Sequence, residues 1–134
     1  ALLADAENRD RSAAVEPVIA AEAVDQMTAM VTGVHVDAAI LSYVARLSEE
    51  SRRHPNVSLG LSVRGGLAFI RCAKVWAVSQ GRGYVVPEDI NDLAHPVLAH
   101  RILLSDEAQF TGVQIASVID ELMNDVAAPA YRAG

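Results

Sequence analysis

One arginine at the start of a predicted helix has the residue type and position best suited to bind a ligand in this chain. The helix is predicted over residues 62–80, and Arg64 falls in its first turn. The positive end of a helix dipole disfavours a cation there by roughly 0.3–1 kcal/mol. A bound anion would offset that cost, because free backbone amides and the guanidinium would then point at one negative charge. The alternative is that the Arg64 side chain is simply solvated and binds no ligand.

The two glycines after this arginine also need a reason. Gly65 and Gly66 each cost about 1 kcal/mol relative to alanine inside a helix, and their plainest role is to let another helix approach closely. Both ends of the helix carry residues that are typical of helix termini. Ser62 can cap the first amides with its hydroxyl, and Gly81 can take the left-handed conformation that stops the helix.

The same helix is apolar around most of its circumference, which predicts a place at the centre of a domain. Phe69, Ala73 and Trp76 fall together on a 3.6-residue wheel. Cys72 is the sole cysteine, so it cannot form an internal disulfide, and it is expected to be a small core residue. A reduced, cytoplasmic setting fits this cysteine usage.

Helices dominate the rest of the chain. The expected fold class is mainly α, a small helical bundle with at most two very short extended segments. Further helices are predicted over residues 21–32, 37–54, 87 to 94 or 95, and 111–125, with loops at 55–60 and 106–112. Residues 34–36, 84–86 and 101–104 are predicted to be extended, and the first two of these segments could pair. Pro96 is expected to end the fourth helix.

The predicted helices each have an apolar face that is expected to be buried. The residues on these faces are Val24, Met27 and Val31, then Ile40, Leu41, Val44 and Leu47, and finally Ile115, Val118, Ile119, Leu122 and Met123. Residues 1–17 lack such periodicity and are expected to be a linker, which leaves residues 18–134 for the helical domain.

Composition excludes two classes of partner. The formal net charge is −6, and nonspecific nucleic-acid binding depends on Lys and Arg neutralising phosphates. No apolar run is long enough to cross a bilayer. Neither nucleic-acid binding nor membrane insertion is therefore expected.

Several catalytic patterns are absent from the sequence. It contains no G-x-x-x-x-G-K-[ST] loop and no strand ending in paired acids that would hold Mg²⁺. The chain alone is therefore not expected to be an enzyme or to bind a metal or a cofactor. His35, His54, His95 and His100 lack zinc spacing, and surface or interface roles are expected for them.

Residues 60–102 resemble the C-terminal lid domain of MoxR-type AAA+ ATPases. The matching motifs are Gly60-x-Ser62-x-Arg64, Ala73-Lys74-x-x-Ala77, Gly81-Arg82 with Tyr84-Val85, Pro87-Glu88-Asp89-Ile90, and Val97-Leu98 with His100-Arg101. Their order and spacing together carry the resemblance, which extends over about residues 18–134.

The resemblance implies that this chain closes the nucleotide pocket of a preceding P-loop domain. In that family the arginine of the first motif is the sensor-2 residue, which reaches the γ-phosphate of ATP, and the matching position is Arg64. Ser62 is a second candidate for nucleotide binding. The family usually has a proline before the arginine, whereas this chain has Val63, which loosens the turn without removing the guanidinium.

The resemblance also implies cofactors and partners. ATP and Mg²⁺ would bind to the full-length parent, whose expected partners are neighbouring subunits of a ring homo-oligomer and a protein with a von Willebrand A domain. Family members act as chaperone-like remodellers. A different class stays open as the alternative, a non-catalytic helical interaction module similar to a histone fold. The acidic charge of the chain argues against that alternative.

Overall fold

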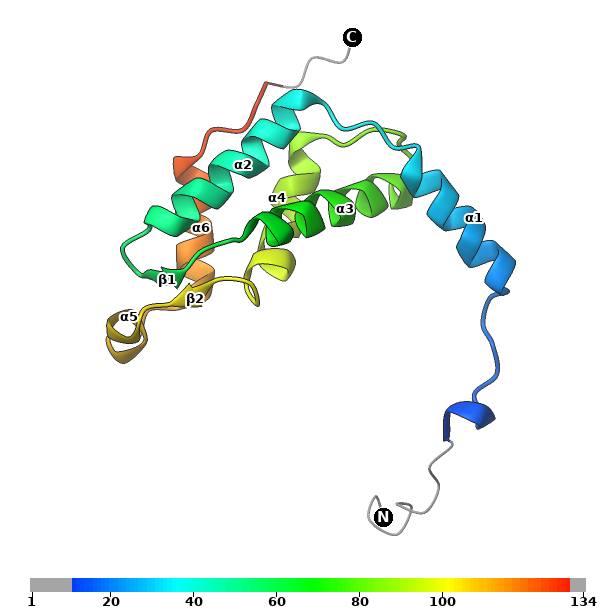
Figure 1. Cartoon of the computed structure of the whole chain (residues 1–134), viewed down its shortest axis with the longest axis horizontal. Helices are drawn as coiled ribbons and strands as arrows, with labels where there is room; N and C mark the ends of the chain where they lie inside the picture. The colour runs from blue at the N-terminus through cyan, green and yellow to red at the C-terminus, as the bar shows by residue number, and fades with distance from the viewer. Residues whose placement is uncertain (1–10, 131–134) are drawn as a thin grey trace.

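A computed structural model describes residues 11–130 as a mainly α-helical domain with one small two-stranded sheet (Figure 1). The elements in chain order are η1 (Arg11–Ala14), α1 (Ala21–Thr32), α2 (Ala38–Arg53), β1 (Val57–Leu59), α3 (Val63–Ser79), α4 (Pro87–Leu98), β2 (Leu103–Leu104), α5 (Asp106–Phe110) and α6 (Ile115–Asp125). The expected fold class is confirmed. Most of the predicted linker, residues 1–10 of 1–17, lies outside the described residues.

The core forms around α3, as its apolar circumference predicts. This helix packs against α2 and α4, and α6 packs against the same two helices. Phe69 and Ala73 of α3 are fully buried, and so is Tyr43 of α2, whose hydroxyl donates to Asn91 Oδ1 at 3.3 Å. Burial raises the pKa of Tyr43 above its ordinary value, and the nearby Arg46 acts in the opposite direction.

In the central helices α2 and α3, Leu41 and Cys72 were predicted to be buried but lie at the surface. Cys72 is exposed because the buried stripe of α3 repeats every fourth residue through Phe69 and Ala73, one position away from the cysteine. Leu41 is exposed because α2 turns Ile40 and Val44 inward. The period of each helix was predicted correctly, but the edges of its buried face were not.

The first helix has the predicted bounds but not the predicted burial. No residue of α1 is buried, and Val24 and Met27 are exposed. Figure 1 shows α1 projecting from one end of the domain. The chain joins the core only at Val34, after the helix has ended. Helix α1 contacts α3, and its Met30 lines a hollow together with Val78, but Val24 and Met27 remain about half exposed.

The predicted pairing of residues 34–36 with residues 84–86 is confirmed as a single parallel bridge between His35 and Tyr84. The amide of His35 donates to the carbonyl of Gly83 at 2.9 Å, and the amide of Val85 donates to the carbonyl of His35 at 3.0 Å. This bridge ties the start of α2 to the loop between α3 and α4.

The loop predicted at residues 55–60 is instead occupied by strand β1. It pairs antiparallel with β2, so that Val57 lies opposite Leu104 and Leu59 lies opposite Leu103. The prediction of an extended segment at residues 101–104 is confirmed only for its second half. A three-residue strand gives too short a pattern to recognise without its partner.

Three boundaries near the C-terminus also differ from prediction. Helix α4 continues through Pro96 to Leu98, because a proline near the end of a helix removes only one late hydrogen bond. The predicted loop at residues 106–112 contains α5, which Ser105 caps by accepting from the amide of Ala108 at 3.1 Å. Helix α6 begins at Ile115 rather than at residue 111.

Candidate functional site

The candidate site lies at the N-terminus of α3. Ser62 has extended backbone angles and caps the helix, since its Oγ accepts from the amide of Gly65 at 3.0 Å. Its carbonyl accepts from the amide of Gly66 at 2.9 Å. These bonds fix the first turn, in which Arg64 is the second helical residue. The predicted cap and the predicted position of Arg64 are both confirmed.

Arg64 is exposed, and its guanidinium makes no hydrogen bond or ion pair with any residue in the described range 11–130. The first turn of α3 contains no acidic residue that could neutralise it. The first amides of a helix have no intrahelical partner, so the guanidinium and the positive helix end share one side of the molecule. This arrangement suits an anion supplied from outside the chain.

The segment that leads into α3 is fixed by α2, which sequence patterns did not reveal. The buried hydroxyl of Ser51 accepts from the amide of Leu61 at 2.8 Å, and the guanidinium of Arg52 donates to the carbonyl of Leu61 at 2.7 Å. Gly60 lies so close to α2 that an added Cβ would be 2.7 Å from the backbone nitrogen of Arg52. These contacts hold Arg64 in place indirectly.

The glycines of the first turn have a structural reason. A Cβ on Gly65 would lie 2.5 Å from Cδ1 of Leu61, and one on Gly66 would lie 3.4 Å from Oγ of Ser48 in α2. Close packing therefore accounts for Gly65, although its neighbour is Leu61 and not the other helix that the prediction named. Gly66 does face α2, but an added Cβ there would make only an ordinary contact. The exposed Arg64 of the same turn is not explained by packing.

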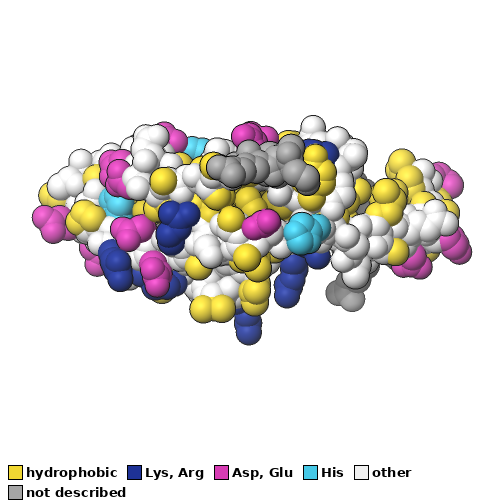
Figure 2. Space-filling view, turned by 90° about the horizontal axis from the view of Figure 1, so that it is seen from above, with side chains coloured by type: hydrophobic (Ala, Val, Ile, Leu, Met, Phe, Trp, Pro, Cys, Tyr) yellow, Lys and Arg dark blue, Asp and Glu magenta, His cyan; other side chains and the backbone are white. Residues whose placement is uncertain are grey.

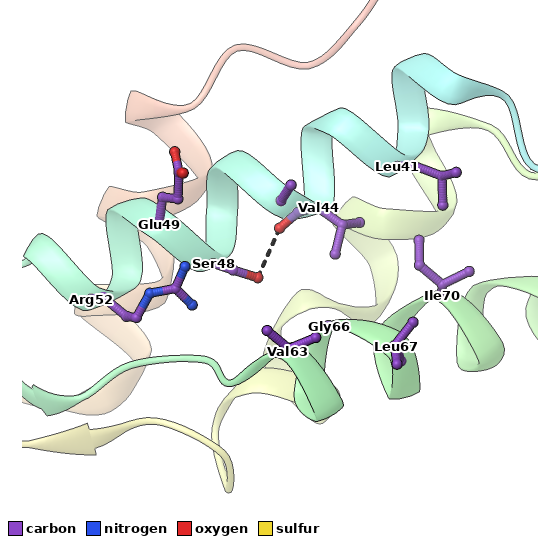
Figure 3. Close-up of a pocket in the computed structure, with 10 residues that line it drawn as sticks. Leu41, Val44, Ser48, Glu49, Arg52, Val63, Gly66, Leu67 and Ile70 are labelled. Carbon is purple, nitrogen blue, oxygen red and sulfur yellow. Dashed lines mark hydrogen bonds between the residues drawn. The ribbon is translucent and has the colours of Figure 1, made fainter.

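A groove next to the site separates α2 from α3 and has a volume of about 240 Å³. Its lining residues are Leu41, Val44, Ala45, Ser48, Glu49, Arg52, Val63, Gly66, Leu67 and Ile70. Figure 3 shows side chains from both helices directed into the gap, and the Ser48 hydroxyl bonded to the carbonyl of Val44 at 2.9 Å. The groove is mostly apolar, so it offers a surface for packing rather than groups for catalysis.

The part of the chain that the structure describes shows no metal-binding cluster. Residues 11–130 contain no group of three or more His, Cys, Asp or Glu side chains that could hold a metal. Two histidines instead join α6 to its neighbours. His54 lies 2.8 Å from Glu121, and His95 lies 2.7 Å from Asp120. None of the helices in this range is both long and apolar enough to span a membrane.

The described residues form a small helical module that presents the Arg64 guanidinium at its surface. The sequence profile of the AAA lid domain matches residues 49–122, a span that includes the whole of α3 and α4. The chain belongs to this family. The match supports the lid over the histone-fold-like alternative.

Proteins with similar sequences include two that are named MoxR or MoxR1. The chain is 38% identical over 118 residues to YeaC of Bacillus subtilis, and this alignment covers 88% of the chain and 37% of that protein. It is 30% identical over 104 residues to "Chaperone MoxR1" of Mycobacterium tuberculosis, covering 71% of the chain and 28% of the relative. It is 33% identical over 87 residues to "Protein MoxR" of Paracoccus denitrificans, covering 55% of the chain and 26% of the relative.

A solved structure shows the same fold. The crystal structure of a protein from Cytophaga hutchinsonii that carries an ATPase assignment superposes on 96% of this chain with a TM-score of 0.79. The sequence identity is 22%, and the match covers 42% of that longer chain. The chain spans about a quarter to a third of the length of the curated relatives that it matches. The resemblance to MoxR-type lids is confirmed.

Proposed function

We propose that this chain is the C-terminal lid of a MoxR-like AAA+ ATPase and closes the nucleotide pocket of a preceding P-loop domain. In this proposal the guanidinium of Arg64 binds the γ-phosphate of ATP and stabilises the charge of the transferring phosphoryl group. The observation that supports it is the exposed Arg64 guanidinium at the start of α3, without a partner within residues 11–130. Ser62 holds the turn that carries it.

The other half of the site would come from the rest of the parent protein. A phosphate-cradling loop and Mg²⁺-binding acids are absent from this sequence, so both belong to the preceding domain in this proposal. Hydrolysis would move the lid as a rigid body within a ring of subunits in the cytoplasm. Chaperone-like remodelling fits the name of the relative "Chaperone MoxR1". A protein with a von Willebrand A domain is the partner that the family resemblance implies.

The proposal is tested by ATP turnover in a polypeptide that carries the nucleotide-binding domain together with this lid. Arg64→Ala should lower turnover at least tenfold, which is about 1.4 kcal/mol, because one charge-assisted contact is lost in the transition state. Arg71→Ala is the matched control, since this residue is also an exposed arginine of α3 but lies two turns further along. An unchanged rate for Arg64→Ala, or an equal loss for both variants, would remove Arg64 from the site.

A further inference from the structure

The end of α2 provides a second arginine next to the candidate site. Arg52 lies in the last turn of α2, and its guanidinium donates to the carbonyl of Leu61 at 2.7 Å. Leu61 is buried and lies three residues before Arg64. Figure 3 shows Arg52 at the end of α2 and Val63 at the start of α3, on opposite sides of one groove. Arg52 therefore holds the residue from which the chain enters the first turn of α3.

The Arg52 guanidinium binds a backbone carbonyl rather than an acidic side chain. It forms no ion pair with any residue in the range 11–130. The next residue, Arg53, instead pairs with Glu50 at 3.4 Å on the surface. Figure 2 shows acidic and basic side chains interspersed at the end of the molecule opposite α1. A charged donor makes a stronger hydrogen bond than a neutral one, so the bond from Arg52 restrains Leu61 firmly.

Consecutive residues of α2 hold both backbone groups of Leu61. Its amide donates to the buried hydroxyl of Ser51 at 2.8 Å, and that hydroxyl donates to the carbonyl of Ser48 at 2.7 Å. Loss of the Ser51 hydroxyl would leave a buried amide unpaired, which destabilises the fold. Arg52 is exposed, so water can replace its guanidinium at the Leu61 carbonyl. Arg52 is therefore the residue of this pair that can be changed while the fold is kept.

The first turn of α3 needs this support because Val63 does not fix its own backbone. Val63 is the first residue of α3 and is 76% exposed. A proline at the first helical position would fix φ at about −65°, whereas valine leaves this angle less restricted. Ser62 has a φ of −73° and a ψ of 164°, the extended angles that suit a residue before proline. The direction of Arg64 therefore depends on how Leu61 is held.

We propose that Arg52 is a positioning residue, which aims the Arg64 guanidinium by holding Leu61 and does not itself contact the nucleotide. This inference rests on the function proposed for Arg64 and adds a residue of α2 to the same site. A contact made in a transition state is sensitive to displacements of about 1 Å. Because Arg52 acts only through Arg64, its loss should have no effect of its own once the Arg64 side chain is removed.

A double-mutant cycle tests this role in the polypeptide that carries both domains, with ATP as the substrate. Arg52→Ala should lower kcat/KM about fivefold, because Arg64 is less well placed. In the Arg64→Ala background the same substitution should change kcat/KM by less than about twofold, since the two residues act as one unit. Arg53→Ala is the matched control, because this neighbouring arginine makes only a surface pair with Glu50, and it should leave kcat/KM unchanged.

Val63→Pro provides a rescue that separates positioning from a general loss of stability. In the Arg52→Ala background the proline should restore at least about half of the lost kcat/KM, because its ring fixes the backbone angle at the start of α3. In the Arg64→Ala background it should restore nothing. Circular dichroism checks that each variant is folded at the assay temperature, and Arg52→Lys replaces Arg52→Ala if that variant unfolds.

The cycle separates failure of this inference from failure of the proposed function. An unchanged kcat/KM for Arg64→Ala would overturn both. A loss for Arg64→Ala with none for Arg52→Ala would overturn only the role of Arg52. The same conclusion would follow from an equal loss for Arg52→Ala in both backgrounds, from an equal loss for Arg53→Ala, or from the absence of rescue by Val63→Pro.

Discussion

At the scale of single residues, an ion pair between Arg82 and Asp89 sets the loop that joins α3 to α4. Both carboxylate oxygens accept from the guanidinium, at 2.9 and 2.5 Å, and one of them also accepts from the amide of Val86 at 2.9 Å. Asp89 is 1% exposed. Gly81 enters this loop with a φ of 77°, which glycine adopts without strain. The Gly-Arg and Pro-Glu-Asp motifs therefore have a structural explanation that is independent of nucleotide.

Asp89→Ala is expected to lower the free energy of unfolding by about 3–5 kcal/mol, because it removes the buried carboxylate that accepts two bonds from the Arg82 guanidinium and one from the amide of Val86. Urea denaturation measures the change. Glu88→Ala is the control, since Glu88 is an exposed acid in the same first turn and should change stability by less than about 0.5 kcal/mol. A loss for Asp89→Ala no larger than that of the control would contradict this account of the loop.

The sequence predicted the positions of individual residues correctly where these depend only on neighbouring residues in the chain. The cap at Ser62 and the position of Arg64 follow from the first turn of one helix, and both were predicted. The bonds of Ser51 and Arg52 to Leu61 were not, because they depend on how the end of α2 meets a segment nine or ten residues further along. No sequence pattern reports such a contact.

At the scale of elements, β1 and the start of α3 are held against the end of α2 by close backbone approach. The two helices α1 and α3 were predicted with nearly correct bounds, although only α3 has a side-chain N-cap. The short elements β1 and α5 were missed, since three or five residues carry too little periodicity and depend on their tertiary partners.

Gly60→Ala tests this close approach. Its Cβ would meet the backbone nitrogen and Cα of Arg52 at 2.7 and 2.8 Å, and a backbone cannot move aside as a flexible side chain can. We expect a loss of stability of about 1–3 kcal/mol and, in the longer polypeptide, a lower ATP turnover, since the start of α3 must shift. Gly83→Ala is the control, because nothing lies within 4 Å of the Cβ that it adds. Equal stability of the two variants, measured by thermal unfolding, would argue against a tight contact.

At the scale of the whole molecule, the surfaces that matter are those that the chain does not bury by itself. Periodicity predicted that the apolar face of α1 would be covered, but it cannot distinguish burial within a chain from burial against another one. Arg64 is a second feature that points beyond this chain. Its position at a helix start favours a bound anion, and the sequence contains no phosphate-binding loop that could hold one. The chain spans only part of the length of its relatives, and in the proposed function Arg64 contacts a nucleotide that another domain holds.

The most direct test of the central claim compares ATP with ADP binding. The polypeptide that carries both domains is titrated with a non-hydrolysable ATP analogue and, separately, with ADP. Because Arg64 is proposed to contact the γ-phosphate alone, Arg64→Ala should weaken binding of the analogue by at least about tenfold and change ADP binding by less than about twofold. Equal weakening for both nucleotides, or no change for either, would contradict the assignment of Arg64 to the γ-phosphate.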